Sequence, residues 1–533
     1  MLAAMTDLLH DLFDASAQRT PAAEALRCRG RGQSYAELEH RSRGIAAGLH
    51  EAGIRRGDRV AVCMQNRPEV VELALACSRL GAIFVPANPL LKVRQLQYLL
   101  NDAGARLLVA SNAATHALDE LLQQCPGVET LVLCDSGSGA ARTRARQLTF
   151  DELASAAPMA HAVNAIADDP AALLYTSGST GRPKGVVVSH RNFIAGAYSV
   201  SQYQRNQPDD RILAALPLSF DYGFSQVTTA FAVGACAVLT NFALPAALLQ
   251  EAAAERITGL AGVPTMWMHL APVEWPKVVV ERLRYVTNSG GAMPKAVLDR
   301  LRAILPATQV FCMYGLTEAF RSSFLDPSLI DARPGSIGKA IPGQELLVLR
   351  SDGTQCAAGE TGELVHRGSL VTLGYWNDPE ATARRFRPLS RQSALPLAEI
   401  AVWSGDLVKA DADGFLYFVG RGDHLIKSSG YRISPLEIEE VIAEIPGVVE
   451  SAAVGVPDES LGQRVAVALV VDARAAPAIA EQVRHHCREQ LPSYMVPAEI
   501  HVRASLPRNV NGKCDRGLLS EQLAAHSAPE ARA

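Results

Sequence analysis

Short apolar segments alternate with amphipathic helical patterns through most of this chain, and the alternation restricts its possible folds more than any other feature. Helical patterns at residues 35–52 and 69–80 are each followed by an apolar run, at 59–64 and 83–86. Further apolar runs lie at residues 106–110, 171–175, 185–188, 235–240, 259–263 and 285–288. Strands and helices in turn favour a parallel sheet covered by helices. The sequence therefore predicts an α/β fold built from β-α-β subdomains.

The pattern changes between residues 335 and 418. Short strand patterns at residues 345–350, 362–367 and 415–419 are separated there by glycine turns. This is typical of a smaller antiparallel lobe, and we expect it to be β-barrel-like. A stretch rich in Ser, Gly and Arg at residues 135–147 is expected to be an exposed loop.

The last part of the chain has its own alternation of helices and strands. Ser434 is expected to cap a helix that has Pro435 at its first position and runs to about Glu444. Glu437 is placed where its carboxylate can return to the cap amide. Strands at residues 450–456, 465–471 and 499–503 and a helix at 479–489 complete this part. We predict a large domain over residues 1–420 and a small α+β domain over residues 424–533, joined by residues 421–423.

Composition excludes some classes of function. The 51 Lys and Arg and 55 Asp and Glu residues give a net charge of −4 without long basic runs, so nucleic acid is not expected as a partner. The ten cysteines form no Cys-x-x-Cys pair, which favours reduced thiols. The first 18 residues lack the basic and apolar regions of a signal peptide. We expect a cytoplasmic protein.

Residues 212–250 carry a single charge, Asp221, and are long enough to cross a bilayer. Proline and glycine residues, among them Pro217, Gly223 and Gly234, break the stretch into short pieces. We therefore expect buried strands and a helix here and no transmembrane segment. A charge in such an apolar stretch needs a partner, which makes Asp221 a candidate functional residue.

The strongest local motif is Tyr175-Thr-Ser-Gly-Ser-Thr-Gly-Arg-Pro-Lys-Gly185, between two apolar strand patterns. Glycines let backbone N–H groups approach an anion closely, hydroxyl groups add donors, and Lys184 adds a positive charge. The motif lacks the Gly-Lys-Ser/Thr ending of a Walker loop. A flexible Ser/Gly hairpin would explain the glycines but not the four hydroxyl residues. The pattern favours a phosphate-binding loop.

This motif resembles the phosphate loop of the adenylate-forming superfamily, which includes acyl-CoA synthetases, luciferases and the adenylation domains of peptide synthetases. Other motifs follow in the order of that family: Asn288-Ser-Gly-Gly-Ala-Met-Pro294, Tyr314-Gly-Leu-Thr-Glu318, Gly374-Tyr-Trp-Asn-Asp-Pro379, Ser404-Gly-Asp406, Gly420-Arg-Gly-Asp423, Ile426-Lys-Ser-Ser-Gly-Tyr-Arg-Ile433 and Pro507-Arg-Asn-Val-Asn-Gly-Lys513. The series covers most of the chain.

The resemblance implies an ATP- and Mg²⁺-dependent ligase that acts in two steps. A carboxylic or amino acid becomes an acyl adenylate, and a thiol of CoA or of the phosphopantetheine arm of an acyl carrier protein then displaces AMP. Two alternatives stay open: an amino-acid adenylation enzyme that only loads a carrier protein, and a catalytically silent nucleotide-binding homologue.

The resemblance also implies roles for individual residues. Lys513 is the main catalytic residue of adenylation, and Glu318, beside Thr317, ligates Mg²⁺. Tyr314 stacks on adenine next to a wall of Gly290, Gly291 and Ala292. The remaining residues bind phosphate (Thr176, Ser177, Gly178, Ser179, Thr180, Gly181 and Lys184), bind ribose (Asp406 and Arg421), form the hinge (Asp423) or enter the site for thioester formation (the loop from Lys427 to Gly430).

The substrate is less constrained. In Leu216-Pro-Leu-Ser-Phe-Asp-Tyr-Gly223, Phe220 replaces the gating histidine of many acyl-CoA synthetases. Asp221 has two interpretations: it binds the α-ammonium group of an amino acid, or it caps a helix that begins at Tyr222. Arg321 either faces the acyl pocket, which suits a polar or acidic substrate, or forms a salt bridge on a helix face.

Three smaller residues are further pocket candidates: Ser225, Ala261 and Ser289. The segments at 220–226 and 313–323 look most similar to two kinds of protein. These are the stand-alone acyl-CoA ligases associated with exosortase systems and the free-standing ligases that load amino acids onto carrier proteins.

Overall fold

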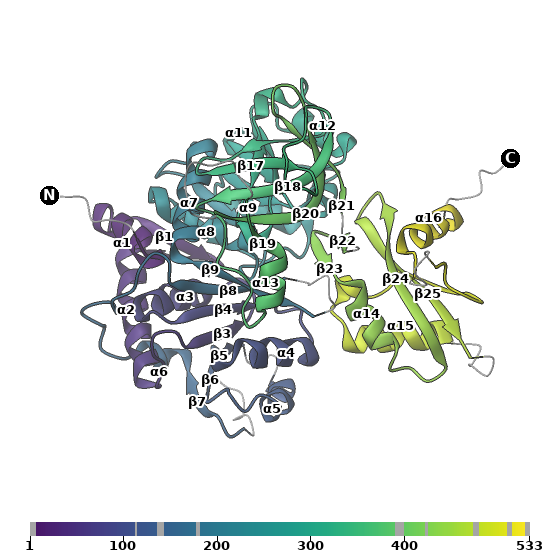
Figure 1. Cartoon of the computed structure of the whole chain (residues 1–533). Coiled ribbons are helices and arrows are strands. Elements are labelled where there is room, and N and C mark those ends of the chain that lie inside the picture. The colour runs from purple at the N-terminus through teal and green to yellow at the C-terminus, as the bar shows by residue number, and fades with distance from the viewer. Residues whose placement is uncertain are drawn as a thin grey trace.

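The computed structural model describes residues 7–111, 115–135, 143–176, 182–389, 399–421, 425–472, 479–508 and 514–527. Figure 1 shows a large body that contains the two larger sheets and a smaller domain, formed by the last part of the chain, packed against one side of it. The predicted α/β fold class is confirmed.

Within the described residues, the first sheet has seven strands in the order β7-β6-β5-β3-β4-β8-β9. It is parallel from β7 to β8, and β9 pairs antiparallel with β8. Its strands are β3 (Arg59–Cys63), β4 (Ile83–Ala87), β5 (Ala105–Ala110), β6 (Thr130–Leu133), β7 (Arg146–Thr149), β8 (Pro170–Thr176) and β9 (Lys184–Ser189). Its surrounding helices are α2 (Tyr35–Glu51), α3 (Pro68–Leu80), α4 (Val93–Ala103), α5 (Thr115–Gln123) and α6 (Phe150–Ala154).

One expectation for this region is wrong. The polar stretch at residues 135–147 is not a loop throughout, because Arg146 and Gln147 begin strand β7 and pair with β6. Pairing with β6 stabilises these polar residues in a strand at the sheet edge, and the composition of the stretch does not reveal that neighbour. Residues 136–142 of the stretch lie outside the described residues.

The second sheet has fourteen strands among the described residues and combines parallel and antiparallel parts. Its parallel strands are β1 (Glu24–Cys28), β10 (Arg211–Ala214), β11 (Cys236–Leu239), β12 (Gly259–Gly262), β13 (Tyr285–Asn288) and β14 (Gln309–Tyr314), with β2 (Arg31–Ser34) antiparallel at one edge. The antiparallel strands are β15 (Ser323–Leu325), β16 (Ser336–Ala340), β17 (Gln344–Leu349), β18 (Thr361–Gly368), β19 (Phe386–Pro388), β20 (Ile400–Ala410) and β21 (Leu416–Arg421).

The antiparallel lobe is present as predicted, and its strands continue the parallel sheet through β15 and β16 rather than forming a separate sheet. The helices of this half are α7 (His190–Gln204), α8 (Asp221–Val233), α9 (Pro245–Ala254), α10 (Pro264–Leu270), α11 (Lys277–Arg282), α12 (Lys295–Ile304) and α13 (Pro379–Arg385). The weakly charged stretch at residues 212–250 holds β10, α8 and β11, as the expected strands and helix, and also the start of a second helix, α9.

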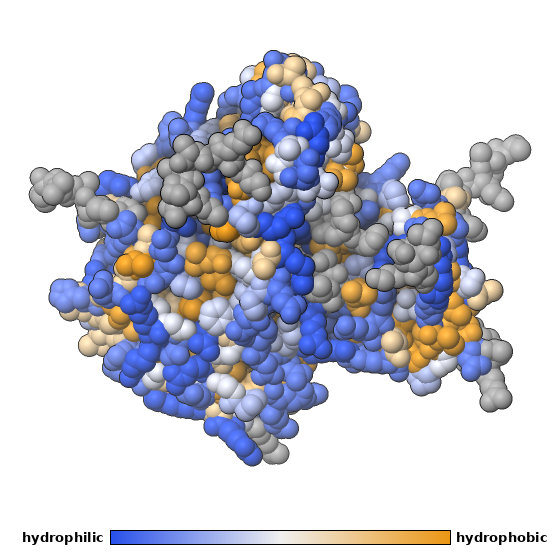
Figure 2. All heavy atoms as spheres, in the orientation of Figure 1, coloured by the Kyte–Doolittle hydropathy of each residue, from blue (hydrophilic) through white to orange (hydrophobic). Residues whose placement is uncertain are grey.

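Hydrophobic burial holds these layers together. Strands such as β4 and β12 are buried along their whole length, which their nearly continuous apolar sequences explain. On the face shown in Figure 2, hydrophilic side chains cover most of the surface. Among the described residues, no helix combines the length and the apolar character needed to cross a membrane.

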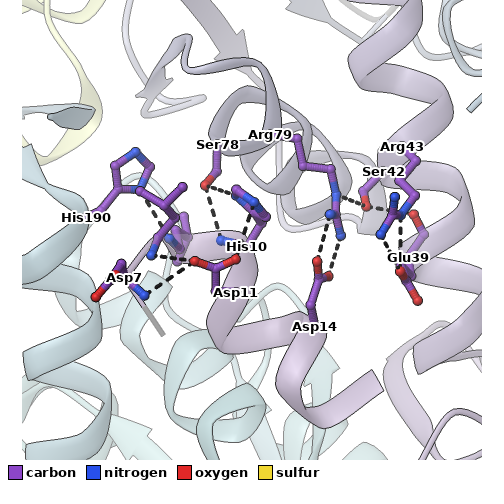
Figure 3. A network of polar contacts seen from close by, with 12 residues as sticks. Asp7, His10, Asp11, Asp14, Glu39, Ser42, Arg43, Ser78, Arg79 and His190 are labelled. Carbon is purple, nitrogen blue, oxygen red and sulfur yellow. Dashed lines mark hydrogen bonds and ion pairs between the residues drawn. The ribbon is translucent and has the colours of Figure 1, made fainter. Parts of the chain in front are cut away.

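A polar network attaches helix α1 (Leu9–Arg19) to the rest of the body (Figure 3). The His10 ring lies 2.8 Å from the Ser78 hydroxyl on α3, and the Leu9 N–H donates to His190 Nδ1 on α7 at 3.1 Å. Arg79 donates to both carboxylate oxygens of Asp14. Burial lowers the pKa of His10 to about 3 and that of His190 to about 4, so both rings are neutral at pH 7.

The C-terminal domain has its own sheet and hydrophobic core. Its strands are β22 (Ile426–Ser428), β23 (Tyr431–Ile433), β24 (Val448–Asp458), β25 (Gly462–Val471) and β26 (Glu499–Val502), and its helices are α14 (Pro435–Ile442), α15 (Ile479–Gln490) and α16 (Arg516–Ser527). Figure 1 shows these elements beside the large body.

The start of α14 is as predicted, but the predicted capping box is absent. Ser434 is the N-cap residue and Pro435 follows it, yet the Ser434 side chain makes no cap hydrogen bond. Glu437 is buried and lines a cavity between the domains, and its Oε2 has no hydrogen-bond partner among the described residues. Burial raises the pKa of Glu437 to about 7. Packing against the body has therefore overridden the local capping pattern.

Candidate active site

A cavity of about 530 Å³ lies between the body and the C-terminal domain. On the body it is lined by residues that follow β10, β12, β13 and β14, and parallel strands collect such loops at the edge where their carboxyl ends meet. The C-terminal domain contributes residues of β22, β23 and α14. The predicted residues that line it are Thr176, Phe220, Asp221, Ser289, Gly290, Thr317, Arg321, Asp406, Lys427 and Gly430.

Asp221 is the first residue of helix α8, and Phe220 occupies the N-cap position. The interpretation in which Asp221 caps a helix beginning at Tyr222 is therefore wrong. Burial raises the pKa of Asp221, while the charge of Arg321 and backbone N–H groups of the first turn act against this shift. A half-buried carboxylate with a raised pKa lines the cavity and is suited to a cationic partner.

Arg321 forms part of the floor of the same cavity and is 5% exposed. Its Nη2 donates to the Ser225 hydroxyl and, at 3.3 Å, to the Asp221 carbonyl oxygen. Its guanidinium carbon lies 4.7 Å from the centre of the Tyr222 ring. No carboxylate of the described residues forms an ion pair with this guanidinium, so the salt-bridge interpretation is not supported.

Two of the smaller pocket candidates do not line the cavity. Ser225 lies beneath Arg321 and holds it in place. Ala261 is 1% exposed and packs into the hydrophobic core as part of β12. Ser289, which follows β13, does line the cavity.

Glu318 lies in a 3₁₀ turn (Thr317–Ala319) and is 3% exposed. The Tyr375 hydroxyl donates to Glu318 Oε1 at 2.7 Å, and Arg432 Nη1 of the C-terminal domain lies 3.6 Å from Oε2. Burial acts to raise the pKa of Glu318, but Arg432, Arg385 and the Tyr375 hydroxyl outweigh it and lower the pKa to about 2. Since Oε2 accepts no hydrogen bond from the described residues, this charged oxygen fits the hard ligand that Mg²⁺ prefers.

The two ends of the predicted phosphate loop lie opposite each other in the antiparallel pair β8 and β9, where Thr176 faces Lys184. Lys184 Nζ lies 3.8 Å from the Asp378 carboxylate and 5.1 Å from the centre of the Tyr375 ring. Burial lowers the pKa of Lys184. Tyr375 thus contacts both Lys184 and Glu318. Ser177, Gly178, Ser179, Thr180 and Gly181 lie outside the described residues.

The residues expected to bind the nucleoside are also close together. The Tyr314 hydroxyl, at the end of β14, donates to the Asp406 carboxylate on β20. Asp406 is paired with Arg421 in the register of β20 and β21, although the Arg421 side chain is not described. The Tyr314 ring is 8% exposed and lies 6.5 Å from the Phe418 ring.

A second cavity, of about 440 Å³, lies between Gly290, Gly291 and Ala292 of the body and several glycines of the C-terminal domain. Gly430 has φ +82°, and a Cβ atom there would lie 3.0 Å from a Val263 methyl carbon. Glycine adopts this conformation without strain and leaves room for the close approach of Val263. Lys427 Nζ lies 5.2 Å from the Phe418 ring. The loop expected to enter the site therefore contacts the body here.

Other predicted residues are not placed. Lys513 and the hinge residue Asp423 lie outside the described residues. Conversely, the structure adds Tyr375, Arg432, Tyr431 and Glu437, to which the sequence motifs assign no role at the site. The sequence could have pointed to three of them because they lie within motifs already recognised: Tyr375 in Gly374-Tyr-Trp, and Tyr431 and Arg432 in Ser429-Gly-Tyr-Arg.

Two family models match this chain. One, described as AMP-binding enzyme, matches residues 13–376, and the other, described as AMP-binding enzyme C-terminal domain, matches residues 437–513. Feruloyl-CoA synthase from Amycolatopsis sp is 32% identical over 94% of this chain and 96% of that protein. A linear gramicidin synthase from Brevibacillus parabrevis is 32% identical over 96% of this chain, which spans 10% of that longer protein.

Two solved complexes of the same enzyme resemble this structure, one more closely than the other. A double mutant of o-succinylbenzoate CoA synthetase from Bacillus subtilis, bound with its product analogue OSB-NCoA, gives a TM-score of 0.82 at 28% identity, covering 96% of this chain and 98% of that one. The enzyme in complex with the acyl-adenylate intermediate OSB-AMP gives 0.67 at 28% identity, covering 95% and 97%. The whole-chain arrangement here is more similar to the product-analogue complex.

Proposed function

The chain belongs to the family of AMP-binding enzymes, and on this premise we propose that it activates a carboxylic acid with ATP and transfers the acyl group to a thiol. The observation that carries the proposal is that Thr176, Thr317 and Asp406 line the interdomain cavity, while Lys184, paired with Thr176, and Glu318, next to Thr317, both contact Tyr375. A silent homologue would not need a buried, ionised Glu318 next to a desolvated Lys184. These two groups favour an active enzyme.

In the first step, a carboxylate oxygen of the substrate forms a bond to the α-phosphorus of ATP, and pyrophosphate leaves with the electron pair of the broken P–O bond. This chemistry needs charge stabilisation more than a protein nucleophile. Lys184 and the loop at residues 176–181 would hold the departing phosphates, and Lys513 would bridge the carboxylate and the phosphate. Mg²⁺, when bound by Glu318, would neutralise charge on the phosphate oxygens.

In the second step, the thiol sulfur bonds to the acyl carbon, the bond to AMP breaks, and the thiol proton passes to solvent. The second cavity leads between the domains toward Gly290 and is lined mainly by small residues, which suits a narrow thiol-bearing arm such as that of CoA or phosphopantetheine. The similarity to the product-analogue complex supports thioester formation in this arrangement. We further propose that residues 424–533 rotate as a lid about residues 421–423 between the steps.

For the substrate, we infer an acid that carries an amino group. Asp221 lines the cavity, burial raises its pKa in spite of the first-turn backbone N–H groups and Arg321, and a bound ammonium group would compensate its charge. A plain fatty chain would cover the Asp221 carboxylate with apolar groups and bring no cation to it. Use of ATP and a CoA-type thiol fits the expected cytoplasmic location.

The test is exchange of labelled pyrophosphate into ATP with a panel of amino acids, their des-amino analogues and fatty acids. We expect exchange with amino acids above the level seen with the matched des-amino acids. A folded protein that binds ATP but supports no exchange with any acid would refute the activation step. Exchange with fatty acids alone would refute only the substrate assignment.

A further inference from the structure

Strand β20 bulges where it pairs with β18, because its residues 404–406 all lie opposite the single residue Leu364. The last residue of this bulge is Asp406, which is buried and lines the cavity. Bulges change the direction of side chains and recur beside active sites. The contacts that fix the bulge therefore decide where the Asp406 carboxylate points.

A carboxylate from the neighbouring strand holds the middle of the bulge. Gly405 has φ +69°, a conformation that glycine adopts without strain, and its N–H donates to Glu363 Oε1 at 2.9 Å. Glu363 belongs to β18 and lies outside the described lining of the cavity. An N–H group that a bulge removes from the strand ladder needs another acceptor, and a carboxylate is a strong one.

The two neighbours of Gly405 are fixed by other groups. The Ser404 hydroxyl donates to the Leu364 carbonyl oxygen at 2.6 Å and accepts the Asp406 N–H at 3.1 Å. The Asp406 carboxylate accepts the Tyr314 hydroxyl. Gly405 lies between these contacts, and a side chain of β18 fixes it.

We propose that Glu363 is a positioning residue for ribose recognition: it holds the Gly405 N–H and thereby aims the Asp406 carboxylate at the ribose hydroxyl groups of the nucleotide. This inference rests on the proposed function, with the ribose-binding role that the motifs imply for Asp406. Glu363 does not itself contact the nucleotide. It acts through the backbone of the bulge.

A purely structural alternative is that Glu363 serves only to pair with Arg387. Arg387 Nη2 lies 3.5 Å from Glu363 Oε2, and the two side chains are 40% and 26% exposed. Partly exposed ion pairs contribute little to stability. The hydrogen bond from Gly405 is shorter and uses the other carboxylate oxygen. The oxygen that faces the bulge therefore makes the stronger contact.

Positioning and stability have different effects on nucleotide binding. A hydrogen bond weakens steeply when its geometry is poor, so a misdirected Asp406 carboxylate would weaken its hydrogen bond to the 2′-hydroxyl group. AMP would then lose affinity, whereas 2′-deoxyAMP, which lacks this hydroxyl group, would lose little. General destabilisation lowers the folded fraction of the protein and leaves the ratio of the two dissociation constants unchanged. The ratio therefore reports positioning.

The test measures binding of AMP and of 2′-deoxyAMP to the full chain by isothermal titration calorimetry, which needs no knowledge of the acid substrate. The wild type is expected to bind AMP about tenfold or more tightly than 2′-deoxyAMP, as one hydrogen bond to a charged group implies. In Glu363→Ala the ratio is expected to fall close to unity. Glu363→Gln keeps an oxygen acceptor for the Gly405 N–H and is expected to keep the wild-type ratio. A wild-type ratio in folded Glu363→Ala, or its loss in Glu363→Gln, would overturn the proposal.

A further variant and a matched control complete the test. Glu363→Asp keeps the charge but withdraws the carboxylate by one methylene group, so it should also lower the ratio and tests the proposal if Glu363→Ala does not fold. The matched control is Glu360, whose carboxylate likewise accepts a backbone N–H, that of Ala357 at 2.9 Å, and contacts Arg350. Glu360→Ala should keep the wild-type ratio. Equal loss in Glu360→Ala and Glu363→Ala would show general loosening of the lobe and overturn the proposal.

Asp406→Ala separates this proposal from the function on which it rests. It is expected to lower the ratio as far as Glu363→Ala does. If the wild type does not prefer AMP, or if Asp406→Ala keeps the preference, the ribose-binding role of Asp406 fails and the proposal fails with it. If Asp406→Ala loses the preference and Glu363→Ala keeps it, the positioning role of Glu363 alone is refuted.

Discussion

Replacing Asp221 with Asn tests the substrate assignment most directly, because it removes the charge and keeps the shape of the side chain. Asp221 lines the cavity from the first position of α8, and burial raises its pKa. An ammonium group about 4 Å from the carboxylate is attracted by ~4 kcal/mol at an effective dielectric constant of about 20. Part of this is lost to desolvation, and a hydrogen bond to a charged group contributes about 1.5–3 kcal/mol net.

That net value corresponds to a fall of about tenfold to 150-fold in kcat/KM for amino acids. The assay is initial-rate pyrophosphate exchange with each amino acid and its des-amino analogue at saturating ATP. The des-amino acids should lose nothing, because they present no charge to Asp221. The matched control is Asp299→Asn, which removes an exposed acid paired with Lys295 and should have no effect.

The pH dependence adds a second constraint on the same residue. Because the pKa of Asp221 is raised, its carboxylate is protonated at a higher pH than an ordinary aspartate, and amino-acid binding should weaken as pH falls through that raised value. Asp221→Asn should abolish this weakening. Equal losses for amino and des-amino acids in Asp221→Asn would refute an ammonium-binding role.

Three other perturbations have definite expected outcomes. Gly430→Ala places a Cβ 3.0 Å from Val263 at φ +82°, so thioester formation from a supplied adenylate should fall about tenfold or more while pyrophosphate exchange is retained; equal loss of both steps would contradict this role of the loop. Lys513→Ala should show the reverse pattern, with exchange lost and thioester formation spared. For His10, the folded-state pKa of about 3 lies below the unfolded value of about 6.5. Its contribution to the stability of the folded protein is therefore complete above pH 6.5 and is lost as pH falls toward 3. The free energy of unfolding, measured with urea, should therefore fall between pH 7 and pH 5 by about 2 kcal/mol more in the wild type than in His10→Gln. An equal fall in both proteins would contradict the neutral, buried ring.

Much of the fold could be predicted because local and tertiary preferences agree. Strand β13 begins and ends at the predicted residues, 285–288, since a short apolar run in a parallel sheet is buried on both faces. Helix α2 starts after Ser34, whose hydroxyl accepts the Glu37 N–H at 3.2 Å, and the Glu37 carboxylate returns to the Ser34 N–H. Such signals lie within a few residues of one another.

The same kind of local signal failed at Ser434 and Glu437, where the sequence again suggests a capping box. There Glu437 lines the interdomain cavity instead of returning to the cap. The two sequence patterns differ in their tertiary surroundings: Glu37 is exposed to solvent, whereas Glu437 is buried. Sequence spacing alone contains no information about which element will cover a carboxylate.

The sequence by itself determined the family and the chemistry, because the phosphate loop and the Tyr314 to Glu318 motif each keep their residues close along the chain. Only the tertiary structure decided that Asp221 begins α8 and faces a cavity with Arg321 beside it. It also showed Arg432 opposite Glu318, across more than a hundred residues of sequence. Charge pairing between such distant residues depends on how whole sheets and domains pack. A carboxylate is strongly destabilising without a partner only when it is buried, and burial is decided by that packing.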